Sequence, residues 1–273
     1  MATIVLIEHE LQDRLGIPYM AHDFARRWEA RGHRVLFHRG VSRPPPGDLA
    51  ILHVDLTVVP ESYRDLARHF SRTLNFRAWD IRKSRYSTAK VSRGDAWAGK
   101  VMIKSEGNHG GYIDDTLRRM SLAEGRASDV EALPVLESYY LCDSIARVPS
   151  ALWDTPGVIV EKFVPELAEG GGYHLRVWTF CGSQSRSTRY LAHEPLIRAR
   201  NYVSREPVEV PEAIRAWREK LGFEMGKFDY VLHEGEYILL DANRTPSAPA
   251  YFADNPEIEA SFDRIARGIE DYL

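Results

Sequence analysis

The sequence predicts an α/β protein in which a small parallel α/β domain precedes a larger, strand-rich region. Residues 1–76 alternate between short apolar runs and helical patterns, which is typical of β-α-β units around a parallel sheet. Residues 77–99 are polar and basic and have no hydrophobic period, so we place the domain boundary there. Beyond this segment, we expect strands to follow one another with little helix between them.

The first domain is predicted to contain four strands and two helices. Met20, Phe24 and Trp28 recur every four residues and therefore share one face of a helix. We expect this helix to start near Pro18, a residue tolerated in a first turn, and to end at Gly32. The strands are expected at 3–7, 34–38, 49–54 and near 73–76, and the second helix at 60–70.

The second region, residues 77–273, is predicted to be dominated by strands. A helix at 211–221 starts on Pro211, and a second helix closes the chain at about 257–272, where apolar residues keep helical spacing. Two further runs are predicted to form a hairpin around Glu234–Gly235. The strands are expected at 100–105, 157–164, 173–180, 187–192, 226–232 and 236–243.

Composition excludes several classes of function. The 273-residue chain has 36 basic and 39 acidic side chains and a formal net charge of −3, which gives no electrostatic footprint for nucleic acid or an anionic membrane. No apolar run is long enough to span a bilayer, and the first ten residues do not resemble a signal peptide. Cys142 and Cys181 lack metal or redox spacing, so we expect a reduced, cytoplasmic setting. The sequence leaves the oligomeric state open, and a homodimer is one alternative.

The last predicted strand ends in polar residues. Because side chains alternate along a strand, Asp241 and Asn243 are expected on one face, which they share with Tyr237 and Leu239. Carboxylate and amide oxygens suit Mg²⁺. The alternative is an ordinary turn, because Asn and Pro are common where strands end, and this stretch alone slightly favours the turn.

Asp229, on the preceding strand, can supply another oxygen only in one register. A two-residue turn at 234–235 would place Asp229 opposite Leu240 and on the wrong face. A bulge or an odd-length loop would place it opposite Asp241. The hairpin geometry therefore decides whether the two acids can meet.

A lysine and a glycine-rich loop follow the strand at 100–105. Lys104 lies near the strand end, and Gly107, Gly110 and Gly111 follow it. Glycines let backbone N–H groups approach phosphate oxygens, and a lysine on the strand can pair with them. A glycine-rich turn without a ligand is the alternative.

The strand at 157–164 contains two charges in an apolar run. Glu161 and Lys162 are costly to bury without partners. An exposed edge strand would explain them without any ligand. The functional interpretation is a nucleotide-binding segment in which backbone groups of 162–164 pair with adenine, with Arg176 on the next strand reaching a phosphate.

Taken in order, these motifs resemble the ATP-grasp superfamily over roughly residues 75–250. The resemblance implies a two-lobed fold, with a small ATP-binding lobe at 77–164 and a large metal- and substrate-binding lobe at 165–273, and it implies ATP and Mg²⁺ as cofactors. By this resemblance, ATP is bound by Lys104, Gly110, Gly111, Glu161, Lys162, Phe163 and Val164, and Mg²⁺ by Asp229, Asp241 and Asn243.

The resemblance also suggests roles for a few further residues. Glu169 is expected to contact the ribose, and Arg176 and Arg244 are expected to act in catalysis. Many relatives have a second phosphate-binding lysine upstream of the glycine loop. Lys83 or Lys90 could take that part, or neither.

The segment 186–205 concentrates arginines. A solvated basic face is one interpretation, and an anion-binding wall for a substrate carboxylate or phosphate is the other. The side chains concerned are Arg186, Arg189, Arg198, Arg200 and Arg205.

The function implied by the resemblance is ATP-dependent carboxylate–amine ligation through an acyl phosphate, with formation of ADP. The substrate would be a small molecule or a peptide with a carboxylate. A small-molecule kinase on the same fold and a nucleotide-binding protein without turnover are the alternatives.

Overall fold

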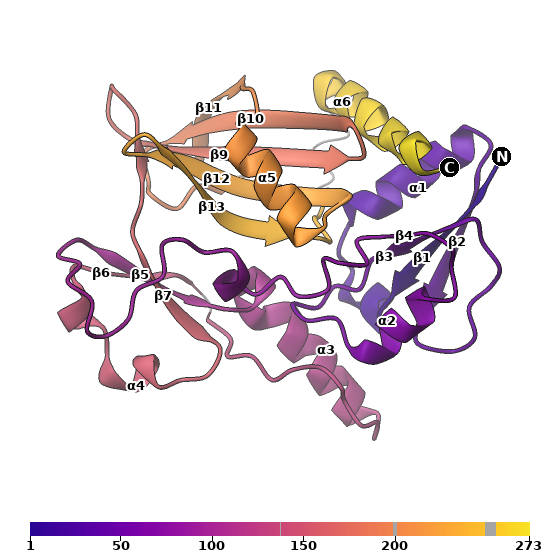
Figure 1. Cartoon of the computed structure of the whole chain (residues 1–273), viewed down its shortest axis with the longest axis horizontal. Helices are drawn as coiled ribbons and strands as arrows, with labels where there is room; N and C mark the ends of the chain where they lie inside the picture. The colour runs from indigo at the N-terminus through magenta and orange to yellow at the C-terminus, as the bar shows by residue number, and fades with distance from the viewer. Residues whose placement is uncertain (137, 199–200, 249–254) are drawn as a thin grey trace.

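Three β-sheets form the framework of the protein (Figure 1). The computed structural model describes residues 1–136, 138–198, 201–248 and 255–273. A four-stranded sheet lies at the end of the molecule that holds both termini, and a three-stranded sheet lies at the opposite end. A six-stranded sheet lies above the space between them in the view of Figure 1. The predicted α/β class is confirmed.

The N-terminal sheet is parallel, as the β-α-β pattern predicts, and its strand order is β2-β1-β3-β4. All six predicted elements of this domain are present, and a short 3₁₀-helix at Gln12–Leu15 precedes the first α-helix. The elements are β1 (Thr3–Glu8), α1 (Met20–Ala30), β2 (Arg34–Arg39), β3 (Leu49–Leu52), α2 (Glu61–Ala67) and β4 (Thr73–Leu74).

Both faces of this sheet are buried, which explains why β1 and β3 are apolar throughout. Ile4 and Leu6 point to a core shared with α1 and with α6 (Pro256–Ala266). Val5 and Ile7 point to a second core shared with α2 and with α3 (Tyr112–Ala123). The sheet therefore lies between two helical layers, and only one helix of each layer comes from the first 76 residues.

Helix α3 corrects the expectation of little helix after residue 99. It begins directly after the glycine-rich loop, with Gly111 in a left-handed conformation at its N-cap and no capping side-chain hydrogen bond. The usual sequence signal for a helix start is therefore absent. Ile113 and Leu117 are its buried anchors on the N-terminal sheet.

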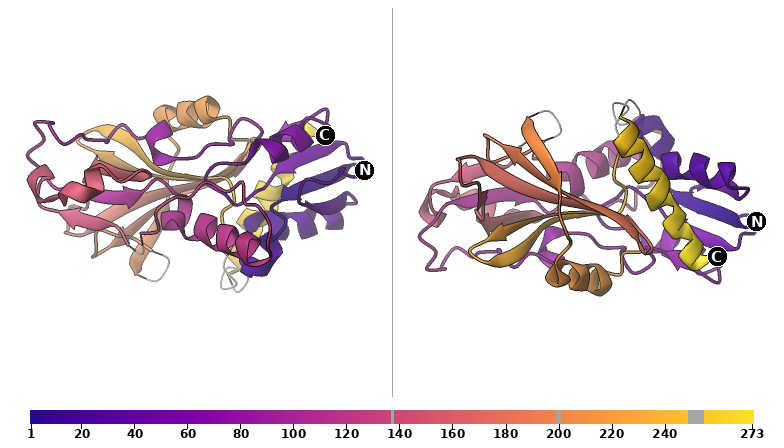
Figure 2. Two further views of the ribbon diagram at one scale, coloured as in Figure 1. Left: turned by 90° about the horizontal axis from the view of Figure 1, so that it is seen from below. Right: turned by 90° about the horizontal axis from the view of Figure 1, so that it is seen from above.

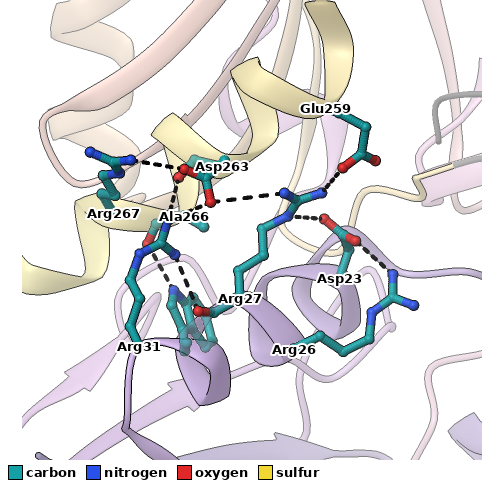
Figure 3. A network of polar contacts seen from close by, with 9 residues as sticks. Asp23, Arg26, Arg27, Arg31, Glu259, Asp263, Ala266 and Arg267 are labelled. Carbon is teal, nitrogen blue, oxygen red and sulfur yellow. Dashed lines mark hydrogen bonds and ion pairs between the residues drawn. The ribbon is translucent and has the colours of Figure 1, made fainter. Parts of the chain in front are cut away.

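The C-terminal helix α6 is held on α1 by ion pairs and by a buried core (Figure 3). Arg27 Nη2 lies 2.7 Å from Glu259 Oε2, and Arg31 Nη2 lies 2.5 Å from Asp263 Oδ1. Beneath these pairs, the Trp28 indole N–H donates to a carbonyl of α6 at 2.8 Å. Seen from above, α6 lies across the junction between the N-terminal and the six-stranded sheets (Figure 2). The last helix of the chain thus packs on the domain formed by its first residues.

The large sheet has the order β11-β10-β9-β12-β13, with β8 pairing β9 at one end. One face carries an aromatic core, which includes Trp178, Phe180 and Phe228 and is covered by α5 (Glu212–Leu221). The prediction missed the short strands β8 and β11. The strands are β8 (Glu166–Leu167), β9 (Tyr173–Cys181), β10 (Gln184–Ala192), β11 (Tyr202–Pro207), β12 (Met225–His233) and β13 (Glu236–Asn243).

The small sheet is antiparallel and has the order β6-β5-β7. Its strands are β5 (Val101–Ser105), β6 (Tyr140–Cys142) and β7 (Val158–Lys162), and the one-turn helix α4 (Ser150–Trp153) lies beside β7. Among the described residues, the remaining elements are 3₁₀-helices at Lys83–Arg85, Ile145–Arg147 and Arg267–Tyr272, and a turn at Asn108–Gly111 that contains non-helical residues. In the part of the chain that the structure describes, no helix is long and apolar enough to cross a membrane.

Glu8 forms a buried polar cluster at the carboxyl end of β1. Its side chain is fully buried, its Oε1 contacts His22 Nε2, and the same oxygen lies 3.4 Å from His53 Nδ1. Arg39 Nε lies 3.2 Å from the other carboxylate oxygen. Burial raises the pKa of Glu8, but the hydrogen bonds and charges of the two histidines outweigh it and lower this pKa from 4.5 to about 2.

This shift predicts acid sensitivity. A carboxyl group with a depressed pKa stabilises the fold fully above its unfolded value, and the contribution is lost as the pH falls from 4.5 towards 2. The contribution is about 3 kcal/mol by the usual conversion of pKa to free energy. In urea unfolding between pH 5 and pH 3, we expect Glu8→Gln to lose less stability than the wild type. The exposed Glu29→Gln should show the wild-type slope, and equal slopes for Glu8→Gln would contradict the assignment.

Candidate active site

A cavity of about 490 Å³ lies between the small sheet and the open face of the large sheet. Its walls come from β5 and β7 on one side and from β9, β12 and β13 on the other. The size is within the range of small-molecule and cofactor sites. Predicted site residues that line it are Lys104, Gly110, Lys162, Phe163, Val164, Asp229, Asp241 and Asn243.

A β-bulge brings the two predicted metal-binding acids together. Glu234 and Gly235 have φ values of 49° and 85°, so the hairpin has a tight two-residue turn with both residues in the left-handed region. The ladder keeps the register of that turn as far as Leu239. It then skips Leu240, and Asp229 pairs directly with Asp241. This is the bulged register that the acid pair requires.

The same bulge overturns one expectation about β13. Tyr237 and Leu239 do not share the face of Asp241, because the extra residue reverses the alternation of the strand. They pack in the aromatic core together with Ala242. Asp241 and Asn243 line the cavity instead.

Asp229 and Lys227 form an ion pair inside the cavity, and sequence reasoning missed the lysine. Lys227 Nζ lies 2.8 Å from Asp229 Oδ2. Burial works against the charge of Lys227, but Asp229 and Asp241 outweigh it and raise the pKa of this ammonium. Burial raises the pKa of Asp229. The two residues lie two apart on β12, so their common face could have been inferred from the sequence.

The donor set of the acid pair fits a hard divalent cation. Asp229 Oδ1 is buried and has no hydrogen-bond partner among the described residues. Asp241 presents a second carboxylate to the same cavity, and Mg²⁺ often uses only one or two carboxylates together with water and phosphate. The oxygen of Asn243 already accepts the Thr245 N–H at 2.8 Å and faces the Asn108 amide at 3.3 Å. Asn243 would therefore have to release a partner to join the metal.

Lys104 and Glu161 form a buried ion pair on adjacent strands of the small sheet. Lys104 Nζ lies 2.6 Å from Glu161 Oε2, and both residues are buried. Glu161 is 3 % exposed, so the exposed-edge interpretation is wrong for this residue. Its carboxylate orients Lys104, whereas Lys104 itself lines the cavity.

The glycine-rich loop lies at one end of the cavity, where Asn108, His109 and Gly110 line it. His109, Gly110 and Gly111 have successive positive φ values of 48°, 69° and 82°. A Cβ on Gly110 would lie 2.5 Å from the Leu136 carbonyl oxygen, so both the φ value and the crowding require glycine there. The His109 side chain lines the cavity, and its Nε2 lies 3.5 Å from the Asn243 amide nitrogen. Gly111 does not line the cavity.

Lys83 is close to this loop, and Lys90 is not. The fully buried Lys83 ammonium donates to the Gly107 carbonyl at 2.9 Å and lies 3.9 Å from Asp241 Oδ1. Burial lowers the pKa of Lys83. Lys90 is exposed, and its backbone forms a bridge with Glu161.

The opposite end of the cavity has the predicted adenine-binding segment. Lys162, Phe163 and Val164 all line it. The N–H groups of Lys162 and Phe163 donate to the carbonyls of Ala89 at 2.7 Å and Lys100 at 2.9 Å. The N–H groups of Lys162 and Phe163 are therefore already used, and an adenine base would have to pair with backbone groups that follow them in the chain.

Glu169 and Arg176 lie outside the cavity lining. Glu169 is exposed in the turn after β8. Arg176 lies on the core side of β9, opposite to Leu175, and its guanidinium forms a two-pronged ion pair with Glu166 at 2.7 to 3.1 Å. We therefore leave both residues out of the proposed site.

Arg244 also lies outside the cavity, where its guanidinium is bound by backbone carbonyls of the protein. It is fully buried and donates to the carbonyls of Val54, Leu56 and Ala78. These groups belong to the segment after β3 and to the connection between the domains. Burial lowers the pKa of Arg244 to about 10, so it stays charged at neutral pH. Arg244 joins the N-terminal domain to the end of β13 and does not line the cavity.

A second cavity of about 280 Å³ opens beside the first. The two share Asp229, Lys227, Asn243, His109 and Arg198, so they meet beside Asp229, whereas Asp241 lines only the first. The second cavity continues along β10 and β11 towards α6.

Three of the five arginines of segment 186–205 line this second cavity. They are Arg186, Arg198 and Arg205. Arg189 lies on the other face of β10 and pairs with Glu206, and Arg200 is outside the described residues. Alternation along the strand thus divides the basic segment between a cavity wall and a solvated face.

Comparisons with known proteins establish the fold. No family model matches the sequence, and neither does any curated protein. The structure is similar to that of D-alanine–D-alanine ligase from Bacillus anthracis complexed with ATP, with a TM-score of 0.53 and 8 % identity over 100 % of this chain and 96 % of the other. A RimK domain ATP-grasp protein from Sphaerobacter thermophilus gives a TM-score of 0.53 and 12 % identity, over 100 % of this chain and 99 % of the other. The macrocyclase MdnC from Microcystis aeruginosa, bound with precursor peptide MdnA, gives a TM-score of 0.52 and 11 % identity, over 98 % of each chain.

These similarities extend over essentially the full length of each chain, at very low sequence identity. They show that the chain has the ATP-grasp fold, as the order of its motifs predicts. The three similar structures are a D-alanine–D-alanine ligase, a RimK domain ATP-grasp protein and a macrocyclase bound with a precursor peptide.

Proposed function

We propose that this chain, which has the ATP-grasp fold, is an ATP- and Mg²⁺-dependent ligase that joins a carboxylate to an amine. One observation carries the proposal. A cavity of about 490 Å³, which holds both Asp229 and its register partner Asp241, and a smaller second cavity meet at Asp229. Phosphoryl transfer between two bound molecules needs such a junction, because the reacting groups must lie in line.

ATP would lie along the first cavity. Its base would contact the segment 162–164, and its phosphates would reach Lys104 and the glycine-rich loop. The lobes predicted at 77–164 and 165–273 would then form the two walls of the nucleotide site. Lys83 supports the loop from behind and adds positive charge near the phosphate end.

Asp229 and Asp241 would hold Mg²⁺. When bound, the ion would neutralise negative charge on the phosphates during transfer. The side chains of the junction position the reactants. Lys227, fixed by Asp229, presents an ammonium where charge on the reacting oxygens would gather.

The reaction would proceed in two steps. A carboxylate oxygen of the substrate attacks the γ-phosphorus of ATP, the bond from that phosphorus to the β–γ bridging oxygen breaks, and ADP leaves. The amine then attacks the acyl carbon, loses a proton and expels inorganic phosphate, so that an amide remains. The second cavity would hold the carboxylate substrate next to the acid pair.

Hydroxylamine trapping tests this proposal. Purified protein with ATP, Mg²⁺ and pools of carboxylic and amino acids should give a hydroxamate, together with ADP and phosphate, only when its substrate is present. Hydroxylamine takes the place of the amine and attacks the same acyl phosphate. Asp229→Asn should abolish the product, whereas Glu169→Gln, an exposed acid outside the cavity, should retain it.

Two outcomes would contradict ligation. A stable phosphorylated product that is indifferent to hydroxylamine would indicate a kinase. Tight ATP binding with no turnover on any acid in the pools would indicate a nucleotide-binding protein.

A further inference from the structure

We infer that the carboxylate substrate is a small molecule with a second anionic group, which docks on Arg186 and Arg205. The inference rests on the proposed function only for the identity of the second cavity as the substrate site. The physical basis is an excess of cationic side chains in that cavity.

Arg186 and Arg205 lie on adjacent strands and face the same space. Arg186, Thr188 and Tyr190 alternate along the cavity face of β10. Arg205 is the register partner of Tyr190 on β11. Burial raises the pKa of Tyr190, and the charges of both arginines oppose this shift, which places both guanidinium groups near the phenol.

The two arginines have only a weak counterion. Their side chains are 19 % and 21 % exposed, and both lean towards Glu257, at 3.8 Å and 3.3 Å. The Glu257 side chain is 74 % exposed, and a solvated carboxylate at these distances contributes little. Largely buried charges are unfavourable unless they are paired and hydrogen-bonded. A ligand anion would supply the missing partner.

The other charges of the cavity do not balance this excess. Arg198 lines both cavities, so its charge belongs to their junction. Lys227 is already matched by Asp229. Arg186 and Arg205 therefore carry the unmatched positive charge at the end formed by β10 and β11.

The shape of the cavity sets the class of ligand. One end is Asp229, beside which a carboxylate must react, and the other is the arginine pair. The rest of the wall combines apolar side chains, among them Val177, Ile258 and Phe262, with the hydroxyls of Thr179 and Thr188. A volume of about 280 Å³ suits a small molecule. The ligand would therefore have two acidic groups separated by a short spacer, the second being a carboxylate or a phosphate.

Binding measurements with defined probes test this inference. In the presence of ADP and Mg²⁺, calorimetry would compare succinate, glutarate and adipate with their monoamides, and with phosphonates that replace one carboxylate. At least one dianion should bind about tenfold more tightly than its monoamide, as expected for charge-assisted hydrogen bonds to arginine. Comparing the affinities of the phosphonates with those of the dicarboxylates shows whether the arginine pair prefers a phosphate-like group or a carboxylate.

The chain offers a matched control on the same strand. Arg186→Gln and Arg205→Gln should each abolish the preference for the dianion, whereas Arg186→Lys should keep part of it. Arg189→Gln should keep all of it, because Arg189 lies on the opposite face of β10. Thermal unfolding of each variant would show that it is folded.

The outcomes separate this inference from the proposed function. If no dianion binds better than its monoamide, or if Arg189→Gln has the same effect as Arg186→Gln, the inference is wrong. If hydroxamate forms only from monocarboxylates and the arginine variants do not change it, the anion site is wrong but the ligase proposal holds. Arginine-dependent dianion binding with no hydroxamate from any acid would support the anion site and overturn the ligase.

Discussion

Asp241→Asn is expected to lower ATP-dependent turnover by about 10²- to 10³-fold while weakening nucleotide binding by less than about tenfold. Asp241 lines the first cavity and is the register partner of Asp229, which lines both cavities. Its charge matters most when negative charge moves from the nucleotide to the acceptor, so its loss affects the transition state more than the bound ground state. Turnover is measured as ADP release with the acid identified by hydroxylamine trapping, and affinity by calorimetry with ADP and Mg²⁺.

The control for this substitution is Glu236→Gln. Glu236 lies on the same strand but is exposed beside the hairpin turn, so its variant should retain wild-type turnover. Wild-type turnover in Asp241→Asn would remove the metal assignment. The polar end of β13 would then be better explained as an ordinary strand end.

Arg244→Met is expected to destabilise the protein by about 3–5 kcal/mol, the usual cost of breaking a buried charged network. The guanidinium is fully buried and satisfies three backbone carbonyls, those of Val54, Leu56 and Ala78. Methionine fills part of the space but donates no hydrogen bond, so the Leu56 and Ala78 carbonyls lose this donor in a buried site, whereas the Val54 carbonyl keeps the Leu56 N–H at 2.9 Å. Urea unfolding at neutral pH measures the free energy directly.

Arg267→Met is the matched control for this stability measurement. Arg267 pairs with Asp263 on the surface of α6, and its side chain is 63 % exposed, so the change should cost less than about 1 kcal/mol. A cost for Arg244→Met as small as that of the control would contradict the structural role. Arg244 would then have to be reconsidered as a residue of the active site.

The N-terminal domain could be predicted from the sequence because its signals are local and strong. The apolar run at 3–7 indicates a strand that is buried on both faces, and the spacing of Met20, Phe24 and Trp28 indicates the helix that covers one of them. Helix α3 escaped prediction because it starts on a left-handed glycine without a capping side chain. The docking of α6 on α1 depends on contacts across more than 200 residues, which local periodicity does not encode.

For the site, the sequence by itself determined which residue types stand at the strand ends, and their order resembles the ATP-grasp motifs, which imply a nucleotide and a divalent cation. Lys104 precedes a loop in which Gly110 and Gly111 have positive φ values and no room for a Cβ, and Asp241 and Asn243 end a strand. The tertiary structure decided which charged side chains meet. Because side chains alternate, the single extra residue Leu240 turns Asp241 into the cavity and Leu239 into the core. Packing likewise decided the roles of the arginines, since the neighbours of a buried guanidinium depend on chain segments far away in sequence. Arg244 meets carbonyls, whereas Arg186 faces the second cavity.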